Sequence, residues 1–540
     1  MRMVKSLVVL FLAAVTVFDS SAQRNKENMP AGIAAEQQWW NLLHYDIDIR
    51  PDYNRKFISG SNKIEFSVIR AGNTMQVDLL EPMKITDVIW ACTHLRFSRS
   101  GSKYFLYFNK SIPAGSKGIV TVFFEGIPQE AVKPPWGSGW IWAKDKLGRP
   151  WISAACEGTG AAVWLPCKNP GYDEPDNGVN FSITVPDTLV AVANGRLLNK
   201  QDGKNGTIIY TWSVTSPINN YNMIASVGKY VSWHKDYPGR AGNLDCDYWV
   251  LDYNIEKAKQ HFLQADTMLR CFEDWLGPYP FYKDSYKLVE TPFLGMEHQS
   301  GIAYGNGFEN GYRLGNLSGT QWGLKWDFLL VHESGHEWFG NSITANNGGE
   351  SWIHEGFTKY LETIYNGYLY GIEAGNDYSI GIWKRIKNDE PVLGSGSSDA
   401  YNKGSALLHM VRQILGDSLF KAMLRHLSEK FYHSTVNTAQ ILQEMNSYTK
   451  HDFTHMFNQY LRTIKIPVLE YSFEGDSLLY RWANCVDGFD MPVKVSIGEG
   501  QQFFIYPSAR WKKIAAGKND ALIFKADRNF YIELKEQKLH

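Results

Sequence analysis

The chain has 540 residues, too many for one ordinary hydrophobic core, because single cores stop growing near roughly 250–300 residues. Hydrophobic residues make up 44% of the chain and charged residues 21%, which is typical of a soluble globular protein. The 55 Lys and Arg residues balance 56 Asp and Glu residues, and the net charge of −1 excludes the basic excess of nucleic-acid-binding proteins. We therefore expect two or three domains and no nucleic-acid partner.

The first 22 residues have the parts of a secretory signal peptide. Arg2 and Lys5 give a basic start, residues 7–18 are apolar, and residues 20–22 are small enough for cleavage. The apolar run is too short to span a bilayer comfortably, and no other segment reaches about 18 unbroken apolar residues. We therefore predict export to the periplasm or the exterior, without an integral membrane segment in the mature protein. An uncleaved anchor helix is the alternative.

Residues 23–250 are predicted to form an N-terminal β-sandwich-like domain. Short runs of alternating apolar and polar residues recur there, as in residues 45–49 and 119–123. Turn pairs such as Asp202-Gly203 and Asn205-Gly206 separate these runs. Alternation of this kind indicates strands with one buried face.

The six cysteines, at positions 92, 156, 167, 246, 271 and 485, are widely spaced and form no CxxC pair. This spacing is typical neither of a disulfide framework nor of a thiolate zinc site. Cys156 and Cys167 could pair in an oxidising compartment, and buried free thiols are an equal alternative.

Residues 251–463 are predicted to be mostly helical. Apolar side chains recur with helical period in residues 255–275, and Gly277-Pro278 ends that segment. Further helical segments are expected at residues 322–339, 355–368, 403–415 and 418–431. In residues 464–540 the alternation returns, which predicts a small C-terminal β domain.

Four residues in the predicted helical region suggest a catalytic metal site. His332 and His336 are spaced i, i+4, so on a helix their imidazoles share one face and can meet one Zn²⁺. Glu333 could act as the base that deprotonates a zinc-bound water. Glu355, at the start of a second helical segment, is the candidate third protein ligand, and a fourth position stays open. We expect one Zn²⁺ per chain.

Residues 332–341, followed by Glu355-Gly356-Phe357, resemble the pattern of the M1 (aminopeptidase N-like) gluzincin family. Residues 295–299 resemble the GxMEN exopeptidase motif of that family. The resemblance implies that Glu297 binds the free α-amine of a peptide, with Gly295 and Met296 beside the substrate. Leu294 stands where the family has the first Gly, and His298 replaces Asn.

Two further segments are similar to motifs of the same family. Tyr401-Asn402-Lys403-Gly404 resembles the YxKG element, which implies that Tyr401 stabilises the oxyanion of the tetrahedral intermediate. Asn402 departs from the Glu common in that element. Cys156-Glu157 resembles the N-terminal-domain signature, which implies that Glu157 is a second carboxylate near the substrate amine.

The resemblance implies a multidomain α+β fold. Its parts are an N-terminal β domain, a thermolysin-like catalytic domain and a small C-terminal β-sandwich; the family's large C-terminal helical domain is expected to be absent. The implied function is an exported zinc aminopeptidase that acts on peptides with a free N-terminus. The sequence indicates neither the oligomeric state nor the preferred N-terminal side chain.

Three other functions are compatible with the same residues. A plain HExxH zinc site also serves endopeptidases, and one branch of the family consists of epoxide hydrolases. A chain of this type can also bind peptides without hydrolysing them. Acetylation of the substrate amine and the zinc content of the protein would distinguish these alternatives.

Overall fold

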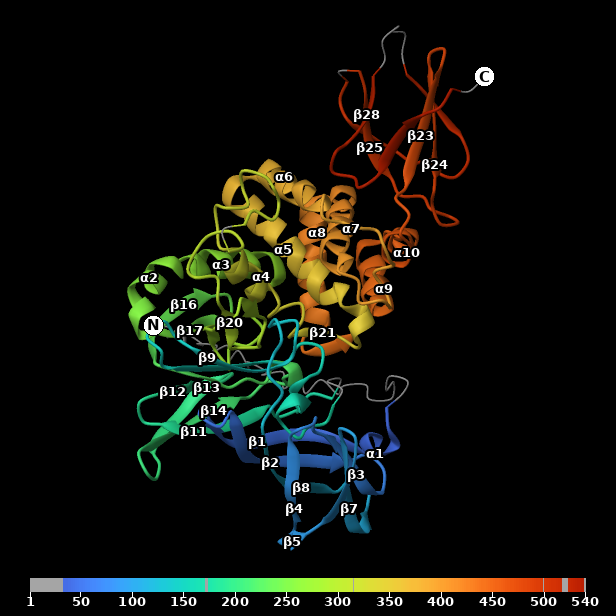
Figure 1. Ribbon diagram of the computed structural model, residues 1–540. Helices are drawn as coiled ribbons and strands as arrows, with labels where there is room; N and C mark the ends of the chain where they lie inside the picture. Colours follow the sequence, from blue (N-terminus) through green and yellow to red (C-terminus); the bar gives the residue numbers. More distant parts are fainter. Residues whose placement is uncertain (1–32, 170–172, 314, 499, 517–522, 539–540) are drawn as a thin grey trace, which may run out of the picture. The chain divides into compact units, whose positions relative to one another are not determined.

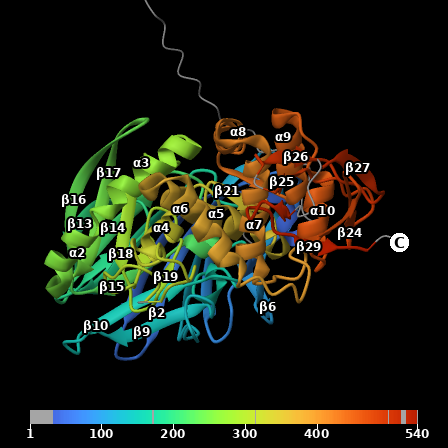
Figure 2. The ribbon, with the colours of Figure 1, turned by 90° about the horizontal axis from the view of Figure 1, so that it is seen from above.

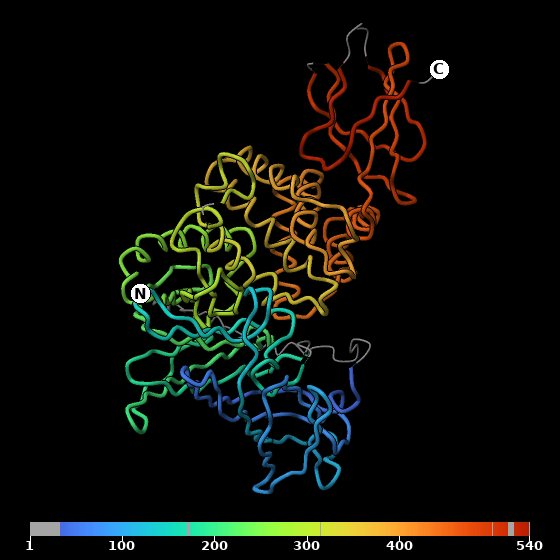
Figure 3. Tube along the Cα trace, viewed as in Figure 1, coloured from blue at the N-terminus to red at the C-terminus, as the bar shows by residue number. Residues whose placement is uncertain are grey.

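The computed structural model describes residues 33–169, 173–313, 315–498, 500–516 and 523–538. The predicted signal peptide, residues 1–22, lies outside the described residues. Within those ranges, every helix is too short or too polar to pass through a lipid bilayer. Figure 3 follows the path of the chain, from the strands that begin at residue 40 through the helices to the last strands.

The N-terminal third of the described chain is rich in strands, as the alternation predicted (Figure 1). Its largest sheet has eight strands in the order β13-β14-β11-β1-β2-β8-β4-β5. Alternate side chains of β1, among them Tyr45, Ile47 and Ile49, are fully buried, which matches the two-residue period of a strand. The bounds are β1 Trp40–Asp52, β2 Phe57–Val68, β4 Lys84–Trp90, β5 Thr93–His94, β8 Lys117–Gly126, β11 Val179–Pro186, β13 Arg196–Asp202 and β14 Thr207–Val214.

Two smaller sheets complete this β-rich region. One has the order β3-β7-β6, and the other has the order β12-β15-β10-β9. The latter leads into the segment that carries Glu157, because β10 ends two residues before it. The bounds are β3 Gly72–Asp78, β6 Arg96–Ser100, β7 Lys103–Ile112, β9 Gly139–Lys144, β10 Pro150–Ala155, β12 Val190–Val192 and β15 Ser226–Gly228.

A five-stranded mixed sheet, β16-β17-β18-β20-β19, joins the β-rich region to the helices. β17 pairs with β18 in parallel, and β19 is its short edge strand, which carries Gly295 and Met296. Strands β18 to β20 lie in the region expected to be mostly helical, since runs this short carry little periodic signal. The bounds are β16 Tyr230–Gly239, β17 Gly242–Leu251, β18 Tyr286–Glu290, β19 Gly295–Met296 and β20 Ile302–Tyr304.

The helical region contains the expected helices with altered ends. The segment 255–275 is divided into α2 and α3, and the segment 322–339 is helical only in α4. The start of α4 is set by Asp327, whose carboxylate accepts hydrogen bonds from the amides of Leu329 and Leu330. The bounds are α2 Ile255–His261, α3 Gln264–Leu276, α4 Phe328–Gly335, α5 Trp352–Tyr370, α6 Ile372–Trp383, α7 Asp399–Leu415, α8 Asp417–Lys430, α9 Thr438–Thr449 and α10 Thr454–Arg462.

Helix α5 is the centre of this region: it packs against α4, α6 and α7 (Figure 2). Its contact with α7 is close because Gly356 and Gly404 face each other. A Cβ atom on Gly356 would lie 3.1 Å from the Cα of Gly404. The two glycines therefore let the start of α7 approach the start of α5, which places Tyr401 near Glu355.

The last strands form two small sheets, in the orders β27-β24-β23-β29 and β26-β25-β28. Their apolar side chains belong to the same buried core cluster as the helices, whereas the N-terminal strands have their own cluster. The bounds are β23 Val468–Glu474, β24 Ser477–Ala483, β25 Val493–Ile497, β26 Phe503–Ile505, β27 Lys512–Ala515, β28 Phe524–Ala526 and β29 Glu533–Glu536. The expected domain boundaries at residues 250 and 463 stay predictions.

All six cysteines lie within the described residues and are free. Cys156 and Cys167 are both buried, and burial raises the pKa of the Cys156 thiol to about 12. Of the two alternatives that the sequence left open, the structure therefore contains the buried thiols.

Candidate active site

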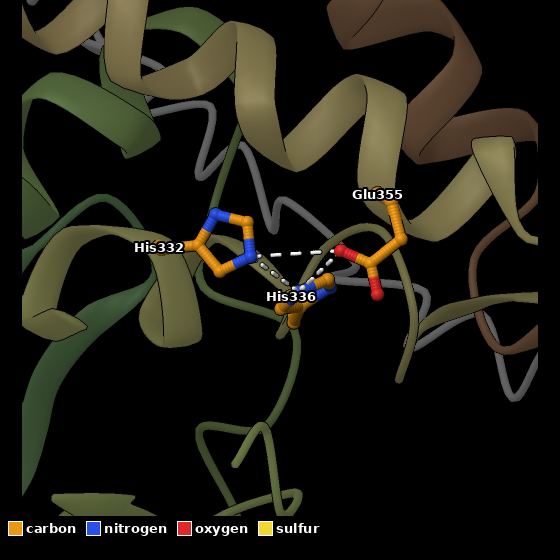
Figure 4. Close-up of side chains that lie close together, drawn as sticks. All are labelled: His332, His336 and Glu355. Carbon is orange, nitrogen blue, oxygen red and sulfur yellow. Dashed lines mark hydrogen bonds and ion pairs between the residues drawn. The ribbon is translucent and has the colours of Figure 1, made fainter. Parts of the chain in front are cut away.

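His332, His336 and Glu355 converge at the meeting point of α4 and α5 (Figure 4). The Nε2 atoms of the two histidines are 3.3 Å apart, and each lies 3.5 Å from Oε2 of Glu355. Ligand atoms that bind one zinc at 2.0–2.1 Å in a tetrahedron are separated by roughly 3.3–3.4 Å. All three side chains are buried, and Oε2 of Glu355 has no hydrogen-bond partner among the described residues. The three groups therefore fit a zinc ion.

The opposite nitrogens of the two imidazoles are held by acceptors. Nδ1 of His332 lies 2.8 Å from Oε1 of Glu362, and Nδ1 of His336 lies 3.0 Å from the carbonyl oxygen of Phe339. These acceptors favour a proton on Nδ1, which leaves the Nε2 lone pairs free for a metal. Metal-binding histidines commonly have such partners.

Sequence reasoning did not single out Glu362. It lies two helical turns after Glu355 in α5, so both carboxylates project from one face of that helix. Its Oε2 accepts a hydrogen bond from Tyr378 at 2.6 Å and lies 2.9 Å from Nζ of Lys359. Burial raises the pKa of Glu362, but Lys359 and His332 outweigh it and hold the pKa below its ordinary value. The two-turn spacing was the signal that could have identified it.

A cleft of about 380 Å³ opens onto the three groups. This volume lies within the range of roughly 300–1,000 Å³ typical of small-ligand pockets. Of the residues selected from sequence, the cleft brings together His332, His336, Glu355, Glu333, Glu297, Glu157, Gly295 and Tyr401. Met296 is not among the lining residues; it packs in a buried cluster with Ala155, Phe293 and Ala303.

Glu333 and Glu297 flank His336 on the open side of the metal ligands. The three residues each offer an atom within 4.8 Å of the others. Burial, followed by the charges of neighbouring carboxylates, raises the pKa of Glu333 well above its ordinary value. The same causes raise the pKa of Glu157 to about 8. So many buried carboxylates favour cationic guests, namely a divalent metal and an ammonium group.

Hydrogen bonds from the zinc-ligand segment hold the loop that carries Glu297. Nδ2 of Asn341 donates to the carbonyl oxygen of Glu297 at 2.8 Å, and Asn222 donates to Asn341 at 2.7 Å. The amide of Ser300 donates to Oε1 of Glu337 at 2.9 Å. Asn341 and Glu337 thus tie the loop to the segment that provides His332 and His336.

The two departures from the family motif both lie inside the protein. His298 is fully buried with neither ring nitrogen hydrogen-bonded among the described residues, and burial lowers its pKa to about 3. Leu294 is also buried and lines the cleft. Gly295 packs on α4, where an added Cβ would come within 2.7 Å of Leu329. A side chain at position 295 would therefore have to displace the side chain of Leu329.

Glu157 and Tyr401 reach the cleft from two other elements. The backbone oxygen of Glu157 accepts a hydrogen bond from the hydroxyl of Ser138. The ring of Tyr401 lies 6.1 Å from that of His332, at an interplanar angle of 16°. Burial, then the charges of Glu355, Glu157 and Glu297, raise the pKa of Tyr401, so its hydroxyl stays protonated and can donate.

Other residues of the cleft were not predicted. Tyr221 is packed nearby, and burial and the charge of Glu297 raise its pKa. Trp136, which is 63% exposed, and Arg385 line the cleft as well. Nothing in their local sequence distinguishes them from surface residues, because only the fold brings them to the metal ligands.

Two histidines and a glutamate at tetrahedral spacing, beside a further carboxylate and a phenol, define a zinc hydrolase site. Residues 317–460 match the Peptidase family M1 domain, so this segment is similar to that family. The family resemblance drawn from the motifs is thereby confirmed.

Two relatives illustrate the similarity. Leukotriene A-4 hydrolase of Xenopus laevis is 23% identical over 464 residues, which cover 78% of this chain and 70% of that protein. Leucine aminopeptidase 2 of Eremothecium gossypii is 26% identical over 322 residues, which cover 56% of this chain and 48% of that protein. The chain thus spans less than half the length of this aminopeptidase.

Solved structures share the fold. An M1 zinc metallopeptidase from Deinococcus radiodurans superposes with a TM-score of 0.62 at 19% identity, covering 76% of this chain and 90% of that one. A mutant of the Deinococcus radiodurans enzyme, bound to a Tyr-Ser-Ala substrate, gives a TM-score of 0.64 at 18% identity and covers 78% and 94%. The N-terminal β-rich region followed by a helical region is therefore the arrangement of M1 peptidases.

Proposed function

We propose that the chain is an exported zinc-dependent aminopeptidase that removes N-terminal residues from peptides. The observation that carries this proposal is that Glu297 and Glu157 line the same cleft as the three metal ligands. Two carboxylates beside a hydrolytic centre attract an ammonium group, which a peptide has only at its N-terminus and on lysine side chains. They therefore favour attack on the first peptide bond over bonds inside a chain.

The proposed roles of the other residues follow from their positions. A zinc ion held by His332, His336 and Glu355 supplies Lewis acidity, which lowers the pKa of water and polarises a carbonyl group. Glu333, beside His336, takes a proton from the attacking water and passes it to the leaving amine. The hydroxyl of Tyr401 donates to the developing oxyanion, an interaction that contributes roughly 3–4 kcal/mol in comparable sites.

The decisive experiment compares a free and a blocked N-terminus. The purified, zinc-replete protein is assayed with an alanyl peptide, its N-acetylated form and an alanyl arylamide. We expect cleavage of the first peptide bond and of the arylamide, and a loss of roughly 100-fold or more on acetylation, since the ammonium–carboxylate contacts disappear. Cleavage of the acetylated peptide at internal bonds would instead identify an endopeptidase.

A second candidate activity is epoxide hydrolysis, which is favoured by the similarity to a leukotriene A-4 hydrolase. The same zinc site would serve an epoxide oxygen as it serves a carbonyl oxygen. Incubation with an unsaturated fatty-acid epoxide, followed by analysis for the diol, tests this activity. The carboxylates of Glu157 and Glu297 favour a peptide, because they repel an acidic lipid and attract an amine.

The finer features of the proposal rest on the sequence. Export follows from the signal peptide at residues 1–22. A thermolysin-like catalytic domain at residues 251–463 and a small C-terminal β-sandwich at residues 464–540 are the proposed domains. Mass analysis of the protein recovered from the culture medium and the periplasm tests export, with a mature N-terminus expected at Gln23.

A further inference from the structure

Arg385 is an exposed cation on the wall of the cleft. It follows the end of α6, and its Nε donates a hydrogen bond of 2.7 Å to the backbone oxygen of Leu317, another lining residue. This bond fixes the guanidinium group at one nitrogen. The two terminal nitrogens keep donors for a second partner, in the planar arrangement that matches a carboxylate.

The other cation that lines the cleft, Lys359, is already neutralised. It is buried, its Nζ lies 2.9 Å from Glu362, and it also lies over the ring of Phe328 at 4.6 Å. Arg385 has no carboxylate within ion-pair distance among the residues that the structure describes.

The acids of the helix that precedes Arg385 bind a different arginine. The two carboxylates of α6, Glu373 and Asp377, lie 2.9 and 2.7 Å from the guanidinium group of Arg528. Arg528 does not line the cleft. Arg528 therefore neutralises the acids of α6, and the charge of Arg385 stays available to a ligand in the cleft.

We propose that Arg385 binds the C-terminal carboxylate of short peptides, which makes the enzyme selective for small free peptides. The inference rests on the proposed aminopeptidase function. A free peptide carries an ammonium group at one end and a carboxylate at the other, and the cleft offers the acids Glu297 and Glu157 and the cation Arg385. A volume of about 380 Å³ suits a ligand of that size.

The test compares matched substrates in wild-type protein and in Arg385→Gln. The substrates are Ala-Ala and Ala-Ala-Ala as free acids and as C-terminal amides, and an alanyl arylamide reports on the metal centre of each preparation. The wild-type kcat/KM is expected to be roughly 10- to 100-fold higher for the better free acid than for its amide, as a charged hydrogen bond provides. The Gln variant is expected to bring this ratio near one, mainly through KM.

Two further variants control for charge and for folding. Arg385→Lys keeps the charge without the planar pair of donors, so an intermediate ratio is expected. Arg528→Gln removes an arginine bound to the same helix outside the cleft, and the acid-to-amide ratio should stay at the wild-type value. Equal loss of the ratio in Arg528→Gln would contradict a direct contact with Arg385.

Other outcomes overturn the inference in distinguishable ways. A wild-type enzyme that cleaves acids and amides equally has no C-terminal carboxylate site. If Arg385→Gln impairs only the cleavage of Ala-Glu-amide, Arg385 recognises acidic side chains instead. If the zinc-replete wild type cleaves neither the arylamide nor any peptide, the proposed aminopeptidase function itself fails.

Discussion

Among the described residues, the candidate active site and a surface cluster each bring imidazole and carboxylate groups within 4.8 Å of one another, yet only the active site resembles a metal centre. His332, His336 and Glu355 are buried between two helices. His234, Asp236 and Asp245 lie on the hairpin of β16 and β17, where the side chains of His234 and Asp236 are 51% and 63% exposed. Similar residue types thus occur in two very different environments.

The orientation of the imidazoles makes the difference. In the surface cluster, Nδ1 of His234 lies 3.0 Å from Asp247 and Nε2 lies 3.3 Å from Asp236, so both nitrogens have acidic partners. Arg196 also binds Asp245. In the buried cluster, Glu362 and Phe339 hold the Nδ1 atoms, and both Nε2 atoms point at the unpartnered oxygen of Glu355. Proximity alone does not make a metal site; a directed lone pair does.

The largest expected difference between the buried and the surface cluster is in zinc binding and in the peptidase activity that depends on it. We expect one zinc per wild-type chain, complete loss of peptidase activity on chelation, and recovery on addition of zinc. His336→Ala removes a direct ligand, so zinc affinity should fall by more than the roughly 10- to 100-fold that outer partners contribute. Elemental analysis and arylamide kinetics measure both effects. Loss of zinc from a His234→Ala variant would contradict the assignment of the metal site to the buried cluster.

Removal of the proposed base should eliminate catalysis without loss of the metal. In Glu333→Gln the ligands His332, His336 and Glu355 are intact, so zinc content should stay at one per chain. The kcat for an alanyl arylamide should fall by roughly 10²- to 10⁴-fold, the usual contribution of general acid–base catalysis. Wild-type activity in a zinc-loaded Glu333→Gln protein would refute the assignment of the base.

A substitution of Glu362 tests whether the acceptor for Nδ1 of His332 makes this site a metal site. Glu362→Gln keeps the side-chain volume but weakens the acceptor for Nδ1 of His332, so zinc affinity should fall roughly 10- to 100-fold. Competition with a chromogenic chelator measures this affinity. The matched control is Asp247→Asn, which removes the charged acceptor for Nδ1 of His234 and should leave zinc affinity unchanged.

The surface cluster should contribute only slightly to stability, and only while His234 is protonated. The hydrogen bond to Asp247 is the main cause that raises the pKa of His234; partial burial opposes it, and Asp236 and Asp245 add to it. A raised folded-state pKa stabilises the protein below the unfolded value of about 6.5, and this contribution disappears as pH rises through the folded pKa. In His234→Ala the free energy of unfolding should therefore fall by less than about 1 kcal/mol near pH 6.

Urea titrations of the wild type and His234→Ala at acidic and alkaline pH measure this contribution. The two proteins should become equally stable well above the folded pKa. A larger loss at alkaline pH than at acidic pH would contradict the ion-pair interpretation. Zinc content serves as the reference, because it should be the same in both proteins at both pH values.

Local patterns in the sequence predicted the three candidate metal ligands that the structure brings together. The i, i+4 spacing of His332 and His336 is a property of one helical turn and needs no tertiary information. The ends of that helix were harder to predict from the sequence. The helix begins at Phe328, after the capping residue Asp327, and it already ends at His336. Apolar residues on both sides of α4 are buried for tertiary reasons, which extended the apparent helical pattern beyond its ends.

Local sequence was sufficient to predict the ligand chemistry, because His332, Glu333 and His336 belong to one helical segment, which His336 ends, and Glu355 lies in the next helix. Motif resemblance added Glu297, Glu157 and Tyr401. The contact of Glu362 with His332 and the burial of Met296 are results of the tertiary fold. Only it left Arg385 without an acidic partner on the wall of the cleft. Such outcomes depend on contacts between segments distant in sequence, and no local period or motif records those contacts.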